Sequence, residues 1–208
     1  MEGLLERFLA MDGSRAFLDR LAALYASMDE AYERVAGLYG FGCGGCGENC
    51  CSQRFHHHTL MEYFYLFEGM KLAGEGRARA IIEKAREVTA SYRAEAETGA
   101  VLPLMCPANF DGLCGLYGHR PMICRLHGLP YEFRRPDGAA SAGGGCHRFA
   151  ALNPGAVEKV DRTGHYTGLA LLERQVRERL GFGGRYKKTT ARMLVDMAGA
   201  LALEGAGP

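Results

Sequence analysis

The chain has 208 residues, of which 48% are hydrophobic and 24% are charged, and its formal net charge is +1. This length and hydrophobic content predict a single domain, residues 1–208, whose core does not depend on a metal ion to fold. The balanced charge gives no reason to expect a nucleic-acid partner, and no apolar stretch is long enough to predict a membrane span.

The N-terminal residues include early acidic side chains and no long apolar run. We therefore expect no signal peptide and a cytoplasmic location. Thiols stay reduced in that compartment, so the eight cysteines of the chain are not expected to form four disulfides. A metal ion is the partner that this argument favours, and the sequence does not indicate which protein partner the chain has.

A long first helix is predicted to begin near Ser14 and to end at Gly40-Phe41-Gly42. Apolar residues recur from Phe17 to Leu38 at alternating spacings of four and three, which is the period of a helix with one buried face. A second stripe of leucine and tyrosine residues runs beside it. Because the apolar face is wide, this helix is expected to pack on more than one neighbour.

Two further helices are predicted before residue 100. Thr59 and Glu62 form the T-x-x-E pattern of a capping box, which predicts a helix over residues 60–72 with Glu62 as a capping residue. The three histidines before it are expected to be a solvated lead-in to this helix. After a break at Gly74, a third helix is predicted to run to about residue 98.

The second half of the chain contains fewer long elements. Proline and glycine are frequent over 101–150, which leaves room only for short elements, such as a strand at Tyr131-Glu132-Phe133. The small residues of 139–145 are expected to form a surface loop. Helical patterns return after residue 153, with a helix closed by Gly181 and a last helix from Thr189 or Thr190 towards residue 203.

The predicted fold class is therefore mainly α. We expect a helical domain with a cysteine-rich metal-binding loop region and at most a small β-hairpin. The cysteine-cluster core is expected over 41–150, with helical parts at 1–40 and 153–208 packing on it.

The eight cysteines fall into two groups, which 54 cysteine-free residues separate. The first group reads C-G-G-C-G-E-N-C-C, and the second lies in the proline-rich half. Thiolates are soft anionic ligands, and glycines beside them permit the tight turns that bring ligands together. The predicted metal ligands are Cys43, Cys46, Cys50, Cys51, Cys106, Cys114, Cys124 and Cys146.

The adjacent pair Cys50 and Cys51 is not expected to serve one small centre, because neighbouring side chains diverge. Cys43, Cys46 and Cys50 have C-x-x-C-x-x-x-C spacing, which suits three corners of one cluster, with a fourth ligand from the later segment. Cys51 would then serve a second centre or pack as a small apolar residue. The spacing indicates a metal without deciding which one.

The later segment makes the sequence recognisable. It reads C-P-A-N-F-D-G-L-C-G-L-Y-G-H-R-P-M-I-C-R. Together with C-x-x-C-x-x-x-C-C upstream, it resembles the YkgJ-type cysteine-cluster family, described as zinc- or iron-chelating proteins. The resemblance covers Cys43 to Cys146, about half of the chain, and places the family's eight cysteines on the eight named above. The family's Y-x-x-R-P-x-x-C-R signature corresponds to Tyr117, Arg120, Pro121, Cys124 and Arg125. The resemblance implies a metal centre of poorly defined function.

Arg120 and Arg125 flank Cys124 in the sequence and are the predicted cofactor-binding residues. Guanidinium groups near thiolates or sulfides stabilise negative charge and raise the potential of a cluster. The main hypothesis is an iron-binding protein, holding an iron–sulfur cluster or iron, with a redox, sensing or metal-handling role. The alternatives are a structural zinc-binding module for partner interaction and a metal-dependent modifying enzyme such as a relative of the flagellin lysine methylases. The sequence does not establish whether the chain is an enzyme.

Overall fold

The computed structural model describes residues 3–42, 50–99 and 104–203, and in these residues the fold is mainly α. The described α-helices are α1 (Leu4–Leu9), α2 (Ser14–Leu38), α3 (Leu60–Leu72), α4 (Glu75–Thr98), α5 (Met122–Leu126), α6 (His147–Leu152), α7 (Thr163–Leu180) and α8 (Thr190–Asp196). Two short 3-10 helices, η1 (Cys50–Ser52) and η2 (Tyr117–His119), lie in the cysteine-bearing segments.

Short strands tie the irregular segments together. They are β1 (His56–His57), β2 (Asn109–Phe110), β3 (Leu113–Cys114), β4 (Tyr131–Arg134), β5 (Ala140–Gly143), β6 (Val160–Asp161) and β7 (Lys188–Thr189). β1 pairs with β7, β2 pairs with β3, and β4 lies between β5 and β6. The β4–β6 pairing is parallel and the others are antiparallel.

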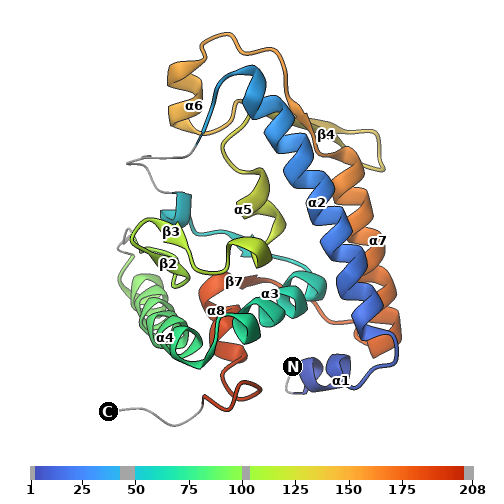
Figure 1. Ribbon diagram of the computed structural model, residues 1–208, viewed down its shortest axis with the longest axis vertical. Helices are drawn as coiled ribbons and strands as arrows, with labels where there is room; N and C mark the ends of the chain where they lie inside the picture. Colours follow the sequence, from blue (N-terminus) through green and yellow to red (C-terminus); the bar gives the residue numbers. More distant parts are fainter. Residues whose placement is uncertain (1–2, 43–49, 100–103, 204–208) are drawn as a thin grey trace.

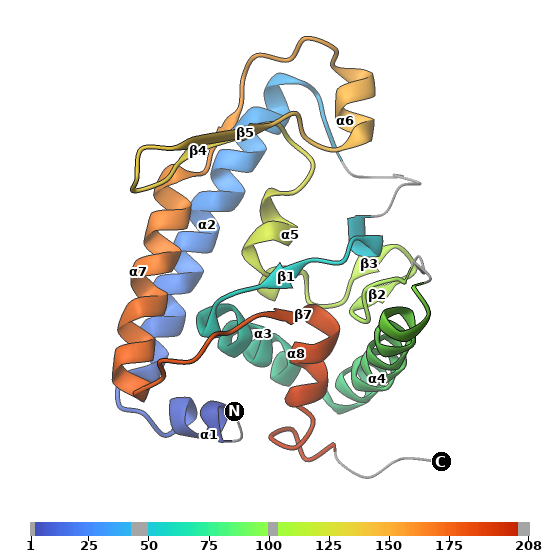
Figure 2. The ribbon, with the colours of Figure 1, turned by 180° about the vertical axis from the view of Figure 1, so that it is seen from behind.

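The long helices α2 and α7 lie side by side along one side of the molecule (Figures 1 and 2). Their close approach uses Gly168 of α7, because a Cβ atom added there would lie 3.1 Å from Leu24 Cδ1. One turn before Leu24 in α2, Arg20 Nη1 donates a hydrogen bond of 2.8 Å to Gln175 Oε1 of α7. The pair forms one wall of the molecule, and α4 lies on the opposite side with α5 between them (Figure 1).

A continuous cluster of buried apolar side chains joins the α2–α7 pair to α4 and contains residues from Leu4 to Leu203. The ring of Phe8 in α1 stacks on Phe64 in α3 with centroids 4.0 Å apart. A single domain requires one shared core, and this cluster is consistent with that requirement. The single-domain organisation itself stays a prediction.

The predicted helices are confirmed with small changes at their ends. Gly13 precedes α2 with a positive φ, and Ser14 is the first helical residue and not the cap. The capping box before α3 is present, since Thr59 Oγ1 accepts a hydrogen bond of 3.2 Å from the Glu62 N–H. α4 ends before Gly99, whose φ of 72° suits a residue without a side chain.

Three local expectations were wrong. Residues 140–143 form β5 and not a free loop, because pairing with β4 supplies hydrogen bonds to this backbone. α8 ends at Asp196, and the chain then continues in turns up to residue 202. His57 is not solvated: it lies in β1, is 2% exposed, and its Nε2 atom is 2.9 Å from Thr190 Oγ1.

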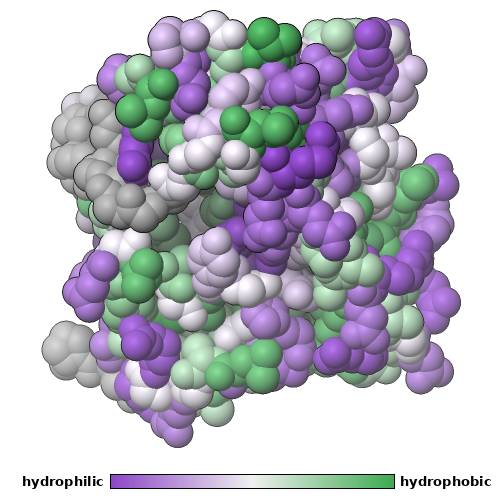
Figure 3. All heavy atoms as spheres, turned by 45° about the horizontal axis from the view of Figure 1, so that its top comes forward, coloured by the Kyte–Doolittle hydropathy of each residue, from purple (hydrophilic) through white to green (hydrophobic). Residues whose placement is uncertain are grey.

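Within the described ranges, no helix is long and apolar enough to span a membrane. On the face drawn in Figure 3, hydrophobic residues occur in small groups among hydrophilic ones.

Candidate metal centre

The six described cysteines all line one cavity of about 560 Å³. They come from separate parts of the fold: η1, the segment before β2, β3, α5 and the start of α6. The set is Cys50, Cys51, Cys106, Cys114, Cys124 and Cys146. All six are half-buried, and each is a free thiol. The structure therefore brings the described members of both cysteine groups, Cys50 and Cys51 from the first and all four from the second, to the wall of one cavity.

A backbone contact joins the two groups directly. The N–H of Cys106 donates a hydrogen bond of 2.8 Å to the carbonyl oxygen of Cys51. The pKa of the Cys51 thiol is lowered to about 6 because the Cys50 side chain, and after it Asn109, hydrogen-bond to it, while burial opposes this shift. Cys51 lines the same cavity as the other described thiols, and the expectation that it serves a second centre or packs as a small apolar residue stays a prediction.

The other inner thiols favour the neutral form. Burial raises the pKa of Cys106 to about 12, and the neighbouring charges of Cys51 and Cys114 add to this effect. Burial likewise raises the pKa of Cys114. It also raises the pKa of Cys124, where the charges of Cys106, Cys114 and Cys51 add to the effect. Several thiolates this close together repel one another, and a bound cation would be required to ionise them at neutral pH.

Glu62 positions the helix that carries Cys124. Its Oε1 atom accepts a hydrogen bond of 3.0 Å from the N–H of Met122, the first residue of α5. Its Oε2 atom accepts a bond of 2.7 Å from Thr59 Oγ1, and His57 Nδ1 lies 3.8 Å from Oε1. Burial raises the pKa of Glu62, but the contacts with His57, Thr59 and Met122 outweigh it and the net pKa is lowered. Glu62 therefore bonds the side chain of the capping residue Thr59 and also anchors α5.

Cys146 is held in place by the backbone around Gly145. The Cys146 N–H donates a bond of 2.9 Å to the Gly128 carbonyl, and its Sγ atom caps α6 by accepting from the Phe149 N–H at 3.4 Å. Gly145 has a φ of 85°, and a Cβ atom there would lie 2.5 Å from the Gly128 oxygen. Only glycine fits this position without moving the backbone that carries Cys146.

We therefore expect Gly145→Ala to destabilise the fold by about 2 kcal/mol or more, since it adds both φ strain and a backbone clash. Gly144→Ala is the matched control, because a Cβ atom at Gly144 has nothing within 4 Å and its φ is ordinary. Thermal unfolding of the two variants measures the difference. Equal melting temperatures would show that this close approach does not constrain the loop.

Arg120 and Arg125 both lie beside the cavity, but their contacts differ. Arg125 is 4% exposed, and all three of its guanidinium nitrogens donate hydrogen bonds. Their acceptors are the Arg120 carbonyl, the Asp29 carboxylate and the Gly118 carbonyl. Arg120 donates from Nη2 to Asp29 at 3.2 Å, while its buried Nε and Nη1 atoms have no hydrogen-bond partner among the described residues. Both positive charges act to lower the pKa of Cys114. The two arginines thus place positive charge next to the thiols.

The predicted ligand set is only partly covered by the structure. Cys43 and Cys46 lie outside the described residues. In the ranges that are described, no three histidine, cysteine, aspartate or glutamate side chains form a ready-made ion site. The expected group of eight ligands therefore stays a prediction.

Sequence reasoning missed two residues of this site. Asn109 lies between Cys106 and Cys114, within reach of the Cys51 thiol, and the segment alone gave no reason to select it. Asp29 pairs with both Arg120 and Arg125 from the middle of α2.

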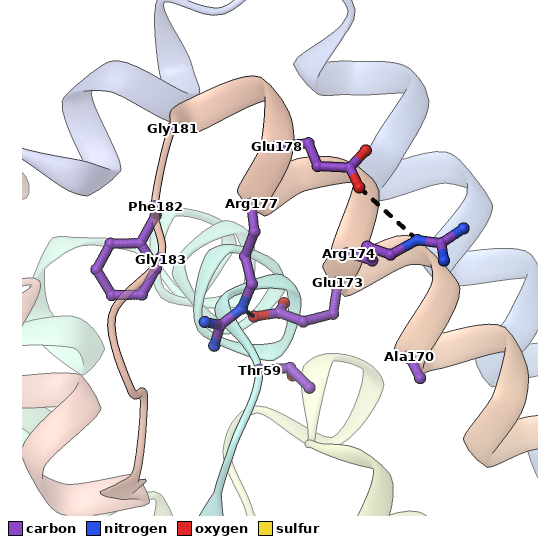
Figure 4. A pocket seen from close by; sticks show the side chains of 9 residues that line it. All are labelled: Thr59, Ala170, Glu173, Arg174, Arg177, Glu178, Gly181, Phe182 and Gly183. Atoms are coloured by element: carbon purple, nitrogen blue, oxygen red, sulfur yellow. Dashed lines mark hydrogen bonds and ion pairs between the residues drawn. The ribbon is translucent and has the colours of Figure 1, made fainter. Parts of the chain in front are cut away.

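A second, shallower hollow lies at the C-terminal end of α7 (Figure 4). Its charged side chains are engaged with one another or with the backbone. Arg177 pairs with Glu173 and donates a hydrogen bond of 2.7 Å from Nη1 to the Gly184 carbonyl. Glu173 in turn accepts a hydrogen bond of 3.0 Å at Oε2 from the Met61 N–H. These contacts tie α7 to the start of α3 and are structural.

Comparisons with family models, with curated proteins and with solved structures found no match. The resemblance to the YkgJ-type family therefore stays an expectation that the quoted residues support.

Proposed function

We propose that this chain binds iron, as an iron–sulfur cluster, through cysteines of both segments. The observation that carries the proposal is the convergence of six free thiols from separate elements on one cavity. Thiolates are the ligands that iron–sulfur clusters use, and free cysteine is more often buried singly than gathered in sixes.

The donor set fits such a group. The charges of Cys106, Cys114 and Cys51 act on Cys124, and those of Cys51 and Cys114 act on Cys106, so these thiols lie close enough to interact. Arg120 and Arg125 offset part of the negative charge that four thiolates and bound sulfides would bring. When bound, an iron–sulfur cluster supplies one-electron redox chemistry. Redox, sensing or metal-handling roles are all consistent with that chemistry.

The first test is the visible spectrum of protein purified without oxygen. We expect a brown protein with broad absorption near the boundary of the blue and violet regions, and bleaching when a strong chelator or air removes the cluster. Zinc has a filled d shell and gives no such absorption. Colourless protein with stoichiometric zinc would favour the structural zinc alternative and contradict the iron–sulfur proposal.

A further inference from the structure

One histidine shares the cavity with the six described thiols. All 7 histidines of the chain lie in the described ranges, and His127 is the one that lines this cavity. His57 has its Nε2 atom bonded to Thr190 instead. His119 packs on the ring of Tyr65 with centroids 4.7 Å apart. Because imidazole nitrogen is a common ligand for iron and zinc, His127 is the additional donor that the cavity offers a metal.

The backbone holds His127 close to two of the thiols. His127 follows directly after α5, the helix that carries Cys124. The next residue, Gly128, accepts with its carbonyl oxygen the hydrogen bond of 2.9 Å from the Cys146 N–H. His127 therefore lies three positions after one cysteine and adjacent to the residue that pairs with another. The two cysteines belong to different elements, so this short segment connects separate parts of the ligand set.

The ring nitrogens of His127 are accessible and unused. Neither nitrogen has a hydrogen-bond partner among the described residues, and neither belongs to the fully enclosed polar atoms that lack one. The side chain is half-buried, so the nitrogens keep accessible surface in a residue that lines the cavity. Phe55 packs edge-on against the ring, with centroids 5.4 Å apart, and limits its movement. The imidazole can therefore reach a group bound in the cavity.

The surroundings of His127 favour the neutral ring, which is the form that binds metals. Burial lowers the pKa of His127, and the positive charge of Arg162 lowers it further. Arg162 is 3% exposed and donates a hydrogen bond to the carbonyl of Leu126, the residue before His127. It does not line the cavity, so it acts on the imidazole without occupying the space beside the thiols. A neutral imidazole has the free lone pair that a metal ligand needs.

We propose that His127 supplies a nitrogen ligand to the metal centre, which then has mixed cysteine and histidine ligation. This inference rests on the proposed function and deepens it by naming a ligand outside the eight cysteines. The described residues contain no ready-made ion site, so the imidazole and the thiols have to move together when the metal binds. A histidine in place of a thiolate removes one negative charge from the ligand set, which raises the reduction potential of an iron–sulfur cluster.

The direct test is pulsed electron paramagnetic resonance of the reduced, oxygen-free protein, in which a ligated imidazole nitrogen couples to the unpaired electron of the cluster. We expect this coupling in the wild-type protein, a changed pattern after histidine is labelled with the heavy nitrogen isotope, and its loss in His127→Gln. His119→Gln is the matched control, because His119 is also half-buried and near Cys124 in sequence but does not line the cavity. A wild-type cluster without histidine coupling would overturn the inference, even if His127→Gln failed to fold.

Metal affinity, measured by competition with a chelator, separates this inference from the proposed function. His127→Gln is expected to bind metal at least about tenfold more weakly, since even the loss of a group behind a ligand costs that much, while His119→Gln is unchanged. His127→Cys replaces the ligand and should recover the metal at a lower reduction potential. Unchanged affinity in folded His127→Gln removes only this inference. Zinc whose binding depends on His127 supports it and removes the iron–sulfur proposal, and a wild-type protein that binds no metal removes both.

Discussion

Cys124→Ser is expected to remove most of the bound metal. Cys124 lies on α5, lines the cavity, and is the thiol on which burial and the charges of Cys51, Cys106 and Cys114 all act. Serine keeps the size but is a poor ligand for iron, so one corner of the centre would be lost. Because metal binding stabilises the ligand segments, both cysteine groups should also become more sensitive to protease.

The same loss is expected for Cys46→Ala, although Cys46 lies outside the described residues. Ile123→Val is the matched control on α5: it removes one methylene next to Cys124 and should keep the metal. The helices should survive in all of these variants because the apolar core is large. If Cys46→Ala and Cys124→Ala both retained the full metal content, the two segments would not share a centre.

The second large effect is expected at Glu62. Glu62→Ala leaves the buried N–H of Met122 without its acceptor and removes the partner of His57 and Thr59. We expect a loss of roughly 2–4 kcal/mol of folding free energy, since each unpaired buried group costs about 1–3 kcal/mol. Glu62→Gln keeps an oxygen in the same place and is expected to lose less than half as much. Chemical denaturation curves measure both values.

The charge of Glu62 also predicts a pH dependence. Its pKa is lower in the folded protein than the usual 4.5. Ionised Glu62 therefore stabilises the fold above that pH, and the contribution is lost as the pH falls through the lowered folded-state pKa. Glu62→Gln should lack this part of the acid dependence. Identical acid-unfolding profiles for the two proteins would show that the carboxylate charge contributes nothing.

The helices could be predicted from the sequence because their signals are local. The capping box at Thr59 and the glycine at Gly99 define the ends of α3 and α4 within a few residues. The metal-binding class of the site stays a prediction, and it rests on the cysteine spacing of the segments themselves. The convergence of the later cysteines with Cys51 was predicted only in outline.

The contacts that shape the cavity depend on tertiary structure. β5 pairs with the preceding strand β4 across the turn at 135–139, although its small residues give no β signal of their own. Asp29 meets Arg120 and Arg125 across 91 and 96 positions of sequence, respectively, and Glu62 meets Met122 across 60. No local pattern encodes such pairs, so the second role of Glu62 and the partner of the arginines became visible only in the folded chain.

The central claim is most directly tested by counting iron, zinc and acid-labile sulfide per chain in protein purified without oxygen. The account predicts iron and sulfide in near-equal amounts, at a stoichiometry that falls in parallel in Cys124→Ser. Stoichiometric zinc without sulfide, or a chain that holds no metal while its six described thiols remain titratable, would contradict it.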